Sequence, residues 1–109
     1  SEGVTEVNFL KNFVVDSIAK DKINKKITLN YTANNYFRNL VPKLYAAVYE
    51  KLSDGTIKLL NVSIGECIGE NVLSIRLPDN ISTSDVYVMK AMFMDKTLKP
   101  LTYIYETIY

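Results

Sequence analysis

The sequence predicts an all-β protein that forms one domain. Three observations indicate this fold class: apolar and polar residues alternate with period two along most of the chain, turn residues recur at spacings of roughly ten residues, and sustained helical periodicity is hard to find. A chain of 109 residues is close to the common size of a single domain, so we treat 1–109 as one domain. Hydrophobic residues make up 48% of the chain, which is enough for a core and argues against intrinsic disorder.

The N-terminal part of the chain, residues 4–17, fits either a strand or a helix. It contains two short apolar stretches that would form one bent strand or two half-strands within 4–15, and some of the same residues also fit one face of a helix. We favour a strand because Val14 and Val15 are β-branched and lose side-chain freedom in a helix.

Alternating segments separated by turn signals predict the remaining strands. In chain order they are Lys25–Asn34, Lys43–Lys51, 57–68, Val72–Leu77, Val86–Met94 and Leu101–Tyr109, with an irregular segment or one helical turn over Asn35–Val41. Asp54-Gly55 is a strong hairpin signal, because a tight turn needs the positive φ that glycine adopts without strain. About seven short strands in a chain of this length predict an immunoglobulin-like antiparallel β-sandwich.

The composition argues against several classes of function. Thirteen basic and twelve acidic residues leave a net charge of +1, which gives no concentrated positive field for nucleic acid. No apolar stretch approaches the length of a membrane span, so we expect no membrane insertion. The chain has no histidine, which removes the commonest acid–base group and metal ligand, and its glycines are scattered rather than gathered in a phosphate-binding loop. We therefore expect no enzyme activity, no cofactor and no metal site.

The single cysteine predicts a sandwich without an internal disulfide. Cys67 has no cysteine to pair with and follows an apolar-interleaved stretch, so we expect it to be a small buried residue. Tyr87, near the start of a late strand, fits the tyrosine corner of immunoglobulin-like domains, and Met89 occupies the position of the cysteine that antibody domains have there. Packing, rather than a bridge between the sheets, would then hold this domain together.

The alternation also predicts a face rich in tyrosine and methionine. Lysines at both ends of 43–51 share a phase with Tyr45 and Tyr49, which places these tyrosines outside and Leu44, Ala46 and Val48 in the core. In 86–94, an inward Tyr87 leaves Met92 and Met94 outside. In the last strand we place Ile104 and Ile108 in the core, together with the position of Glu106, and the tyrosines outside. These three strands are neighbours in an immunoglobulin-like sheet, so the candidate interaction face comprises Tyr45, Tyr49, Met92, Met94, Tyr103 and Tyr105.

Three interpretations of this face stay open. A neighbouring module, the N-terminal segment or the stems of lysine side chains would cover it in a purely structural domain. An exposed apolar surface of this kind also marks interaction sites, because tyrosine and methionine are common in protein interfaces. Tyrosine rings stack on sugars as well, although a chain without tryptophan lacks the side chain that sugar sites most often use.

Two segments carry a resemblance to a known group of proteins. Tyr49–Ile57 combines an aromatic residue, an acidic residue and an Asp-Gly turn with a following aliphatic strand, and Met89–Asp95 with Leu98–Leu101 combines alternating apolar residues, an aspartate, a short turn and Lys-Pro-Leu. Over roughly residues 43–105 the chain resembles bacterial immunoglobulin-like or fibronectin type III-like accessory modules of secreted or surface multidomain proteins, many of them carbohydrate-active. Those modules have tryptophan where this chain has Met94.

The resemblance implies a function without catalysis. It leads us to expect a structural or spacer module of an extracellular bacterial protein at the cell surface, excised from a longer chain. Its partners would be neighbouring modules of the same chain, another protein or a second copy of itself, which includes a role in adhesion. The alternative is a carbohydrate-binding module attached to a glycoside-processing enzyme.

Overall fold

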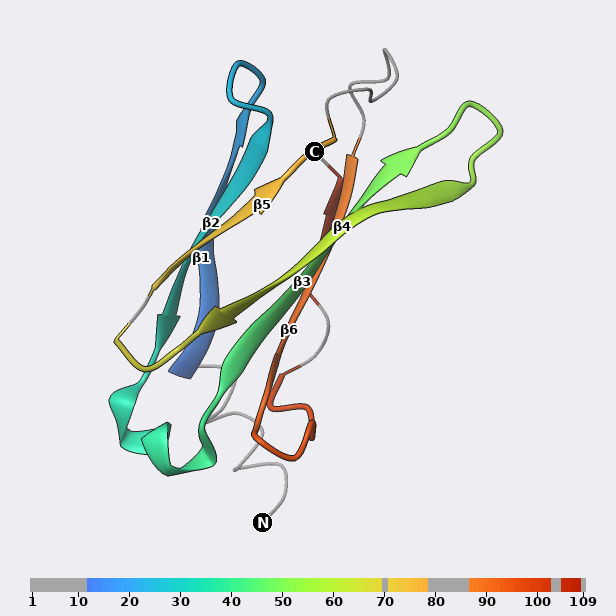
Figure 1. Ribbon diagram of the computed structural model, residues 1–109. Helices are drawn as coiled ribbons and strands as arrows, with labels where there is room; N and C mark the ends of the chain where they lie inside the picture. The colour runs from blue at the N-terminus through green and yellow to red at the C-terminus, as the bar shows by residue number, and fades with distance from the viewer. Residues whose placement is uncertain (1–11, 70, 79–86, 103–104, 109) are drawn as a thin grey trace.

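The described strands form two antiparallel sheets, which pack face to face (Figure 1). The computed structural model describes residues 12–69, 71–78, 87–102 and 105–108. One sheet has the strand order β1 (Phe13–Asp21), β2 (Lys26–Ala33) and β5 (Val72–Arg76), and the other has the order β4 (Ile57–Glu66), β3 (Lys43–Lys51), β6 (Tyr87–Met94) and β7 (Tyr105–Ile108). The prediction of an all-β fold is confirmed.

The middle of the chain follows the sequence prediction closely. β3 begins at Lys43 and ends at Lys51, and the segment before it forms one short 3₁₀ helix, η1 (Asn35–Leu40). The predicted hairpin turn is present as well: Gly55 has φ +89°, and the Leu52 amide donates to the Thr56 carbonyl at 2.8 Å. β3, β6 and β7 are neighbours in one sheet, as we expected of these three segments.

The first strand lies further along the chain than predicted. β1 runs from Phe13 to Asp21, so residues 13–17 are extended as we favoured, whereas residues 4–11 lie outside the described part of the chain. A bulge between Val15 and Ser17 shifts the register against β2 by one residue. Val15 and Ile18 therefore both pack against the core although they are three positions apart. Because this bulge breaks the alternation, residues 16–21 were not predicted to be part of the strand.

The last strand begins later than predicted. Pro100 makes only an isolated bridge to Met94, and Leu101 bends inward and is buried in the core. The Leu101 amide donates to the Phe93 carbonyl at 2.9 Å, which holds the bend in place. The strand pairing with β6 resumes at Tyr105, so apolar character at Leu101 marks a core contact rather than the start of β7.

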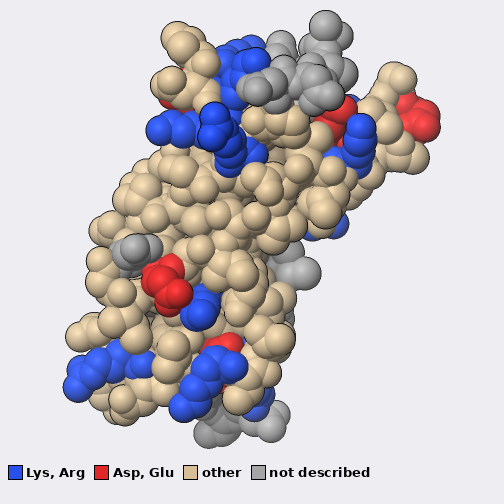
Figure 2. Space-filling model, viewed as in Figure 1, with Lys and Arg blue, Asp and Glu red and all other residues tan. Residues whose placement is uncertain are grey.

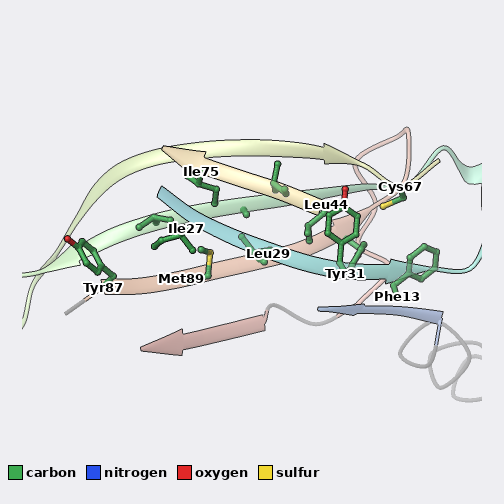
Figure 3. Packing of buried hydrophobic residues seen from close by; sticks show 14 of the residues in the cluster. Phe13, Ile27, Leu29, Tyr31, Leu44, Cys67, Ile75, Tyr87 and Met89 are labelled. Carbon is green, nitrogen blue, oxygen red and sulfur yellow. The ribbon is translucent and has the colours of Figure 1, made fainter. Parts of the chain in front are cut away.

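One hydrophobic core fills the space between the sheets (Figure 3). The inward residues of β2, β3, β5 and β6 are those that the alternation predicted, and they include Ile27, Leu29, Tyr31, Leu44, Ala46, Val48, Leu73, Ile75, Met89, Ala91 and Phe93. Tyr87 is buried at the start of β6, as expected; the residues just before it, 79–86, lie outside the described part of the chain. Cys67 is buried and has no disulfide, so packing joins the two sheets.

A tyrosine and a glycine tie the sheets together at one edge. Tyr31 of β2 reaches across the sandwich, and its hydroxyl donates to the carbonyl of Glu66 at the end of β4. Gly65 leaves the space that this hydroxyl occupies, because a Cβ at that position would lie 2.7 Å from Tyr31 Oη and 3.3 Å from the Cβ of Leu73. The glycine is therefore required for a close approach and not for a turn.

Further along the same edge, side chains of β4 contact the backbone of β5 in the other sheet. Asn61 Nδ2 donates to the carbonyl of Arg76 at 2.8 Å, and Ser63 Oγ lies 3.5 Å from the carbonyl of Ser74. The Val62 amide donates to Asn61 Oδ1 at 2.9 Å. Exposed edge strands are prone to pair with other chains. Here Asn61 occupies the polar groups of both strands, so this part of the edge offers little to an added strand.

Candidate functional site

The outer surface of the four-stranded sheet brings predicted site residues together. Tyr45 of β3 pairs with Met92 of β6 on one side and with Ile64 of β4 on the other. Ala47, two positions along, lies between Lys90 and Val62 in the same way. We call the outward side chains of these strands the Tyr/Met face; it comprises Lys43, Tyr45, Ala47, Tyr49, Leu59, Val62, Ile64, Lys90, Met92 and Met94.

An apolar groove of about 200 Å³ crosses the centre of the Tyr/Met face. Tyr45 and Tyr49 stand at its two ends, roughly 13 Å apart along the strand, because an extended chain rises ~3.3 Å per residue. Ala47 lies between the tyrosines, and its small side chain leaves the hollow. Val62 forms one wall of the groove, and Lys90 with Met92 forms the other.

A ridge of aliphatic side chains runs beside the groove on β4. Leu59 and Ile64 are each 53% exposed, and Val62 between them is 52% exposed. These residues were not predicted from the sequence, because the strand that returns from the Asp54-Gly55 turn carries no charge pattern that marks its outward phase. The signal was present: with β3 paired by that tight turn, the residues opposite Ala47 and Tyr45 must share their face.

Two ion pairs flank the Tyr/Met face. Lys43 Nζ lies 3.5 Å from Glu66 Oε1 on the β4 side, and Lys90 Nζ lies 3.9 Å from Glu106 Oε2 on the β7 side. The Lys90 ammonium also lies 5.5 Å from the centroid of the Tyr49 ring, within the range of a cation–π contact. Four charged side chains of this face thus lie in pairs of opposite charge, and Lys51 lies in the same outward row at the end of β3. In the view of Figure 2, charged side chains gather mainly toward the two ends of the molecule, and uncharged surface extends between them.

The predicted site residues have different outcomes. Tyr45, Tyr49 and Met92 line the groove, and Met94 lies on the same face opposite Lys43, at the edge of the groove rather than in it. Tyr103 lies outside the described residues. Of Tyr105 only the backbone is described, and it pairs with Ala91 in the inward row of β6, so the register does not place this position on the Tyr/Met face. A lysine side chain covers part of the face, because Lys90 lies over the ring of Tyr49.

The predicted phase of the last strand is wrong over its described residues. We placed the position of Glu106 with the core-facing isoleucines and the tyrosines outside, whereas Glu106 pairs with Lys90 and lies exposed on the outer face. The neighbouring Tyr105 position pairs with Ala91, which is buried in the core. The physical reason is the attraction between the two side chains, together with the cost of burying an unpaired carboxylate. The outward phase of Lys90 was predicted correctly, and the opposite charge on the next strand was the signal that would have corrected the assignment.

Two buried groups lie apart from this face. Burial, and next the nearby Glu66 carboxylate, raise the pKa of the Cys67 thiol to about 12, so the reactive thiolate is scarce at neutral pH. Glu50 continues the inward row of β3 beyond Val48 and is buried at the end of the core, opposite Tyr87 in the register.

Comparison with protein-family models finds no match, and comparison with curated proteins finds no relative. The resemblance to bacterial immunoglobulin-like modules therefore stays a prediction. None of the helices in the described ranges has the length and apolar character that a membrane span requires. Within those same ranges, no three His, Cys, Asp or Glu side chains gather as metal ligands would.

Proposed function

We propose that this chain is an immunoglobulin-like, non-catalytic module that binds a protein partner through the Tyr/Met face. The strand order supports the fold assignment: β1, β2 and β5 correspond to strands A, B and E of the immunoglobulin pattern, and β3, β6 and β7 to strands C, F and G. β4 joins the C strand at the edge of the second sheet, which is where additional strands attach in members of this architecture.

The single observation that carries the binding function is the groove with its adjoining ridge. Apolar side chains that are half exposed and contiguous are uncommon on the surface of a monomer, and they mark interaction sites. The groove volume of about 200 Å³ lies below the range of roughly 300–1,000 Å³ that small-molecule pockets occupy. It suits a single large apolar side chain of a partner, which is how anchor residues are seated in protein interfaces.

A carbohydrate ligand is the second candidate, and the two tyrosines that frame the groove favour it. Aromatic rings pack against the apolar faces of sugars, and Lys90 with the tyrosine hydroxyls would supply polar contacts. The aliphatic ridge of Val62 and Ile64 has no role in such a site, so we rank protein binding first. The location outside the cell, the bacterial multidomain context and the spacer role remain predictions from the resemblance.

A display library of random peptides, selected on the immobilised domain, tests the proposed function. We expect enriched peptides that share one large apolar residue and that lose binding to Val62→Lys. Val72→Lys is the matched control, because Val72 is 47% exposed on the outer surface of the other sheet and is replaced in the same way. Selected peptides that bind both variants equally, or a selection without any enrichment, would overturn the proposal. Binding to a glycan array that Tyr45→Ala abolishes would favour the carbohydrate candidate instead.

A further inference from the structure

We propose that the partner of the Tyr/Met face is a second copy of the same chain, docked face to face about a two-fold axis. This inference rests on the proposed function, since it names the occupant of the same surface. In such a symmetric interface the same patch serves both subunits, so the patch has to be complementary to itself in shape and in charge.

The shape of the face meets that condition. It carries a hollow, centred on Ala47 between two tyrosines, and directly beside it a ridge formed by Leu59, Val62 and Ile64. A two-fold axis between the two features places the ridge of one copy over the groove of the other, twice.

The charges on the face meet the condition as well. Beside the groove, Lys43 lies next to Glu66 on one flank and Lys90 next to Glu106 on the other, and Lys51 lies beyond the groove at the end of β3. A face with net charge would repel its own copy, whereas balanced pairs can exchange partners across a two-fold axis. The apolar centre between the pairs is the arrangement expected of a symmetric interface with a polar rim.

The edge of β4 is less suited than the Tyr/Met face to contact a second copy. Two copies of a sandwich can also associate by pairing edge strands. At β4 the Asn61 side chain accepts from the Val62 amide and donates to the Arg76 carbonyl, so the middle of this edge is already occupied. The outward side chains of the same strand remain half exposed. The open surface of β4 is therefore its face, and association through it leaves these hydrogen bonds in place.

Sedimentation velocity of the full chain over a concentration series tests the inference. We expect a concentration-dependent monomer–dimer equilibrium for the wild type. Val62→Lys and Ile64→Lys each place a charge on the ridge and should weaken dimerisation at least about tenfold, whereas Val72→Lys should leave it unchanged. Far-ultraviolet circular dichroism of each variant establishes whether it is folded. If one of the two ridge variants does not fold, the other one provides the test.

A charge reversal separates a symmetric interface from other dimers. Lys90→Glu gives the flank two carboxylates on both copies and should weaken dimerisation, and adding Glu106→Lys restores the balance and should restore the dimer. A wild type that stays monomeric up to about 1 mM overturns the inference. Dimers that Val62→Lys and Val72→Lys affect equally overturn it too. If the monomeric wild type still binds selected peptides through the face, only this inference fails; if it binds none, the proposed function fails with it.

Discussion

The two outer surfaces of the sandwich differ in the chemistry of their side chains. On the three-stranded sheet, polar side chains bond to one another across the strands: Asn30 Nδ2 donates to Ser17 Oγ at 3.2 Å, and Thr32 Oγ1 donates to Asp16 Oδ2 at 2.5 Å. On the four-stranded sheet, the corresponding positions hold tyrosine, methionine and aliphatic residues. Both surfaces belong to sheets with the same core, so core packing does not explain the difference. The polar side chains of the first surface form hydrogen bonds with one another, whereas the second surface exposes apolar side chains to water.

The largest effect should come from disturbing the contact that joins the two sheets. Gly65→Ala places a Cβ 2.7 Å from Tyr31 Oη, and we expect it to lower the free energy of unfolding by about 1–3 kcal/mol. Tyr31→Phe removes the hydroxyl and, alone, should cost about 1 kcal/mol through the lost bond to Glu66. Urea denaturation of both variants and of the double variant measures the coupling. Because the clash needs both groups, the double variant should be more stable than the sum of the single losses; strict additivity would contradict the account.

A smaller loss should follow where the two sheets meet at β4 and β5. Asn61→Ala removes the bonds to the Arg76 carbonyl and to the Val62 amide, so we expect a loss of about 1 kcal/mol in urea denaturation. Ser63→Ala is the control, because its contact to the Ser74 carbonyl is 3.5 Å long and should contribute less. Equal losses in the two variants would show that the asparagine does not close the edge.

Acid should destabilise turns that adjoin both sheets, because aspartates accept hydrogen bonds in them. Two of these turns adjoin the four-stranded sheet and one adjoins the three-stranded sheet. A bond from the Thr97 hydroxyl, and then one from the Lys99 amide, lower the pKa of Asp95; a bond from the Thr56 hydroxyl does the same for Asp54. On the three-stranded sheet, the Asn24 amide lowers the pKa of Asp21.

A pKa that is lower in the folded state means that the unfolded chain binds protons first as the pH falls. The stabilisation is therefore complete above the unfolded pKa, roughly pH 4, and is lost as the pH drops through the lower folded value. We expect urea midpoints to stay level above about pH 5 and to fall below about pH 4. Asp95→Asn should flatten part of this fall. A profile for this variant that parallels the wild type would refute the assignment.

The smallest effect concerns the ion pair on the Tyr/Met face. Lys90→Met keeps the apolar stem over Tyr49 but removes the charge, and both partners of the pair are more than a third exposed. Exposed pairs contribute little, so we expect a change of about 0.5 kcal/mol or less in the free energy of unfolding. A loss above roughly 1.5 kcal/mol would mean that the charge stabilises the monomer, and that its role is not confined to the surface.

The predictability of this fold from sequence varied with the regularity of the alternation. β3 was predicted to the residue, because lysines mark both ends of an unbroken period of two. β1 was placed too early, because the bulge after Val15 shifts the inward positions by one residue and imitates a break. Leu101 was taken for the start of the last strand, because a buried residue in a bend and one in a strand are equally apolar.

The candidate site was predictable only on the strands whose phase was marked by charge. Lysines showed which side of β3 faces water, so Tyr45 and Tyr49 were placed on the outer face. Val62 and Ile64 carry no such mark, and only the pairing with β3 puts them beside the tyrosines. The hollow at Ala47 depends on what flanks it on two other strands, which no single segment of sequence contains.

The single buried cysteine allows the opening of one end of the domain to be measured. Cys67 lies just after β4, where the chain turns toward β5, and its thiol is both buried and held far from the thiolate form. A thiol reagent can modify it only while this end of the sandwich is open, so the labelling rate at low denaturant counts opening events. Comparing that rate with the rate of global unfolding would show whether the corner joining the two sheets opens by itself or only when the whole domain unfolds.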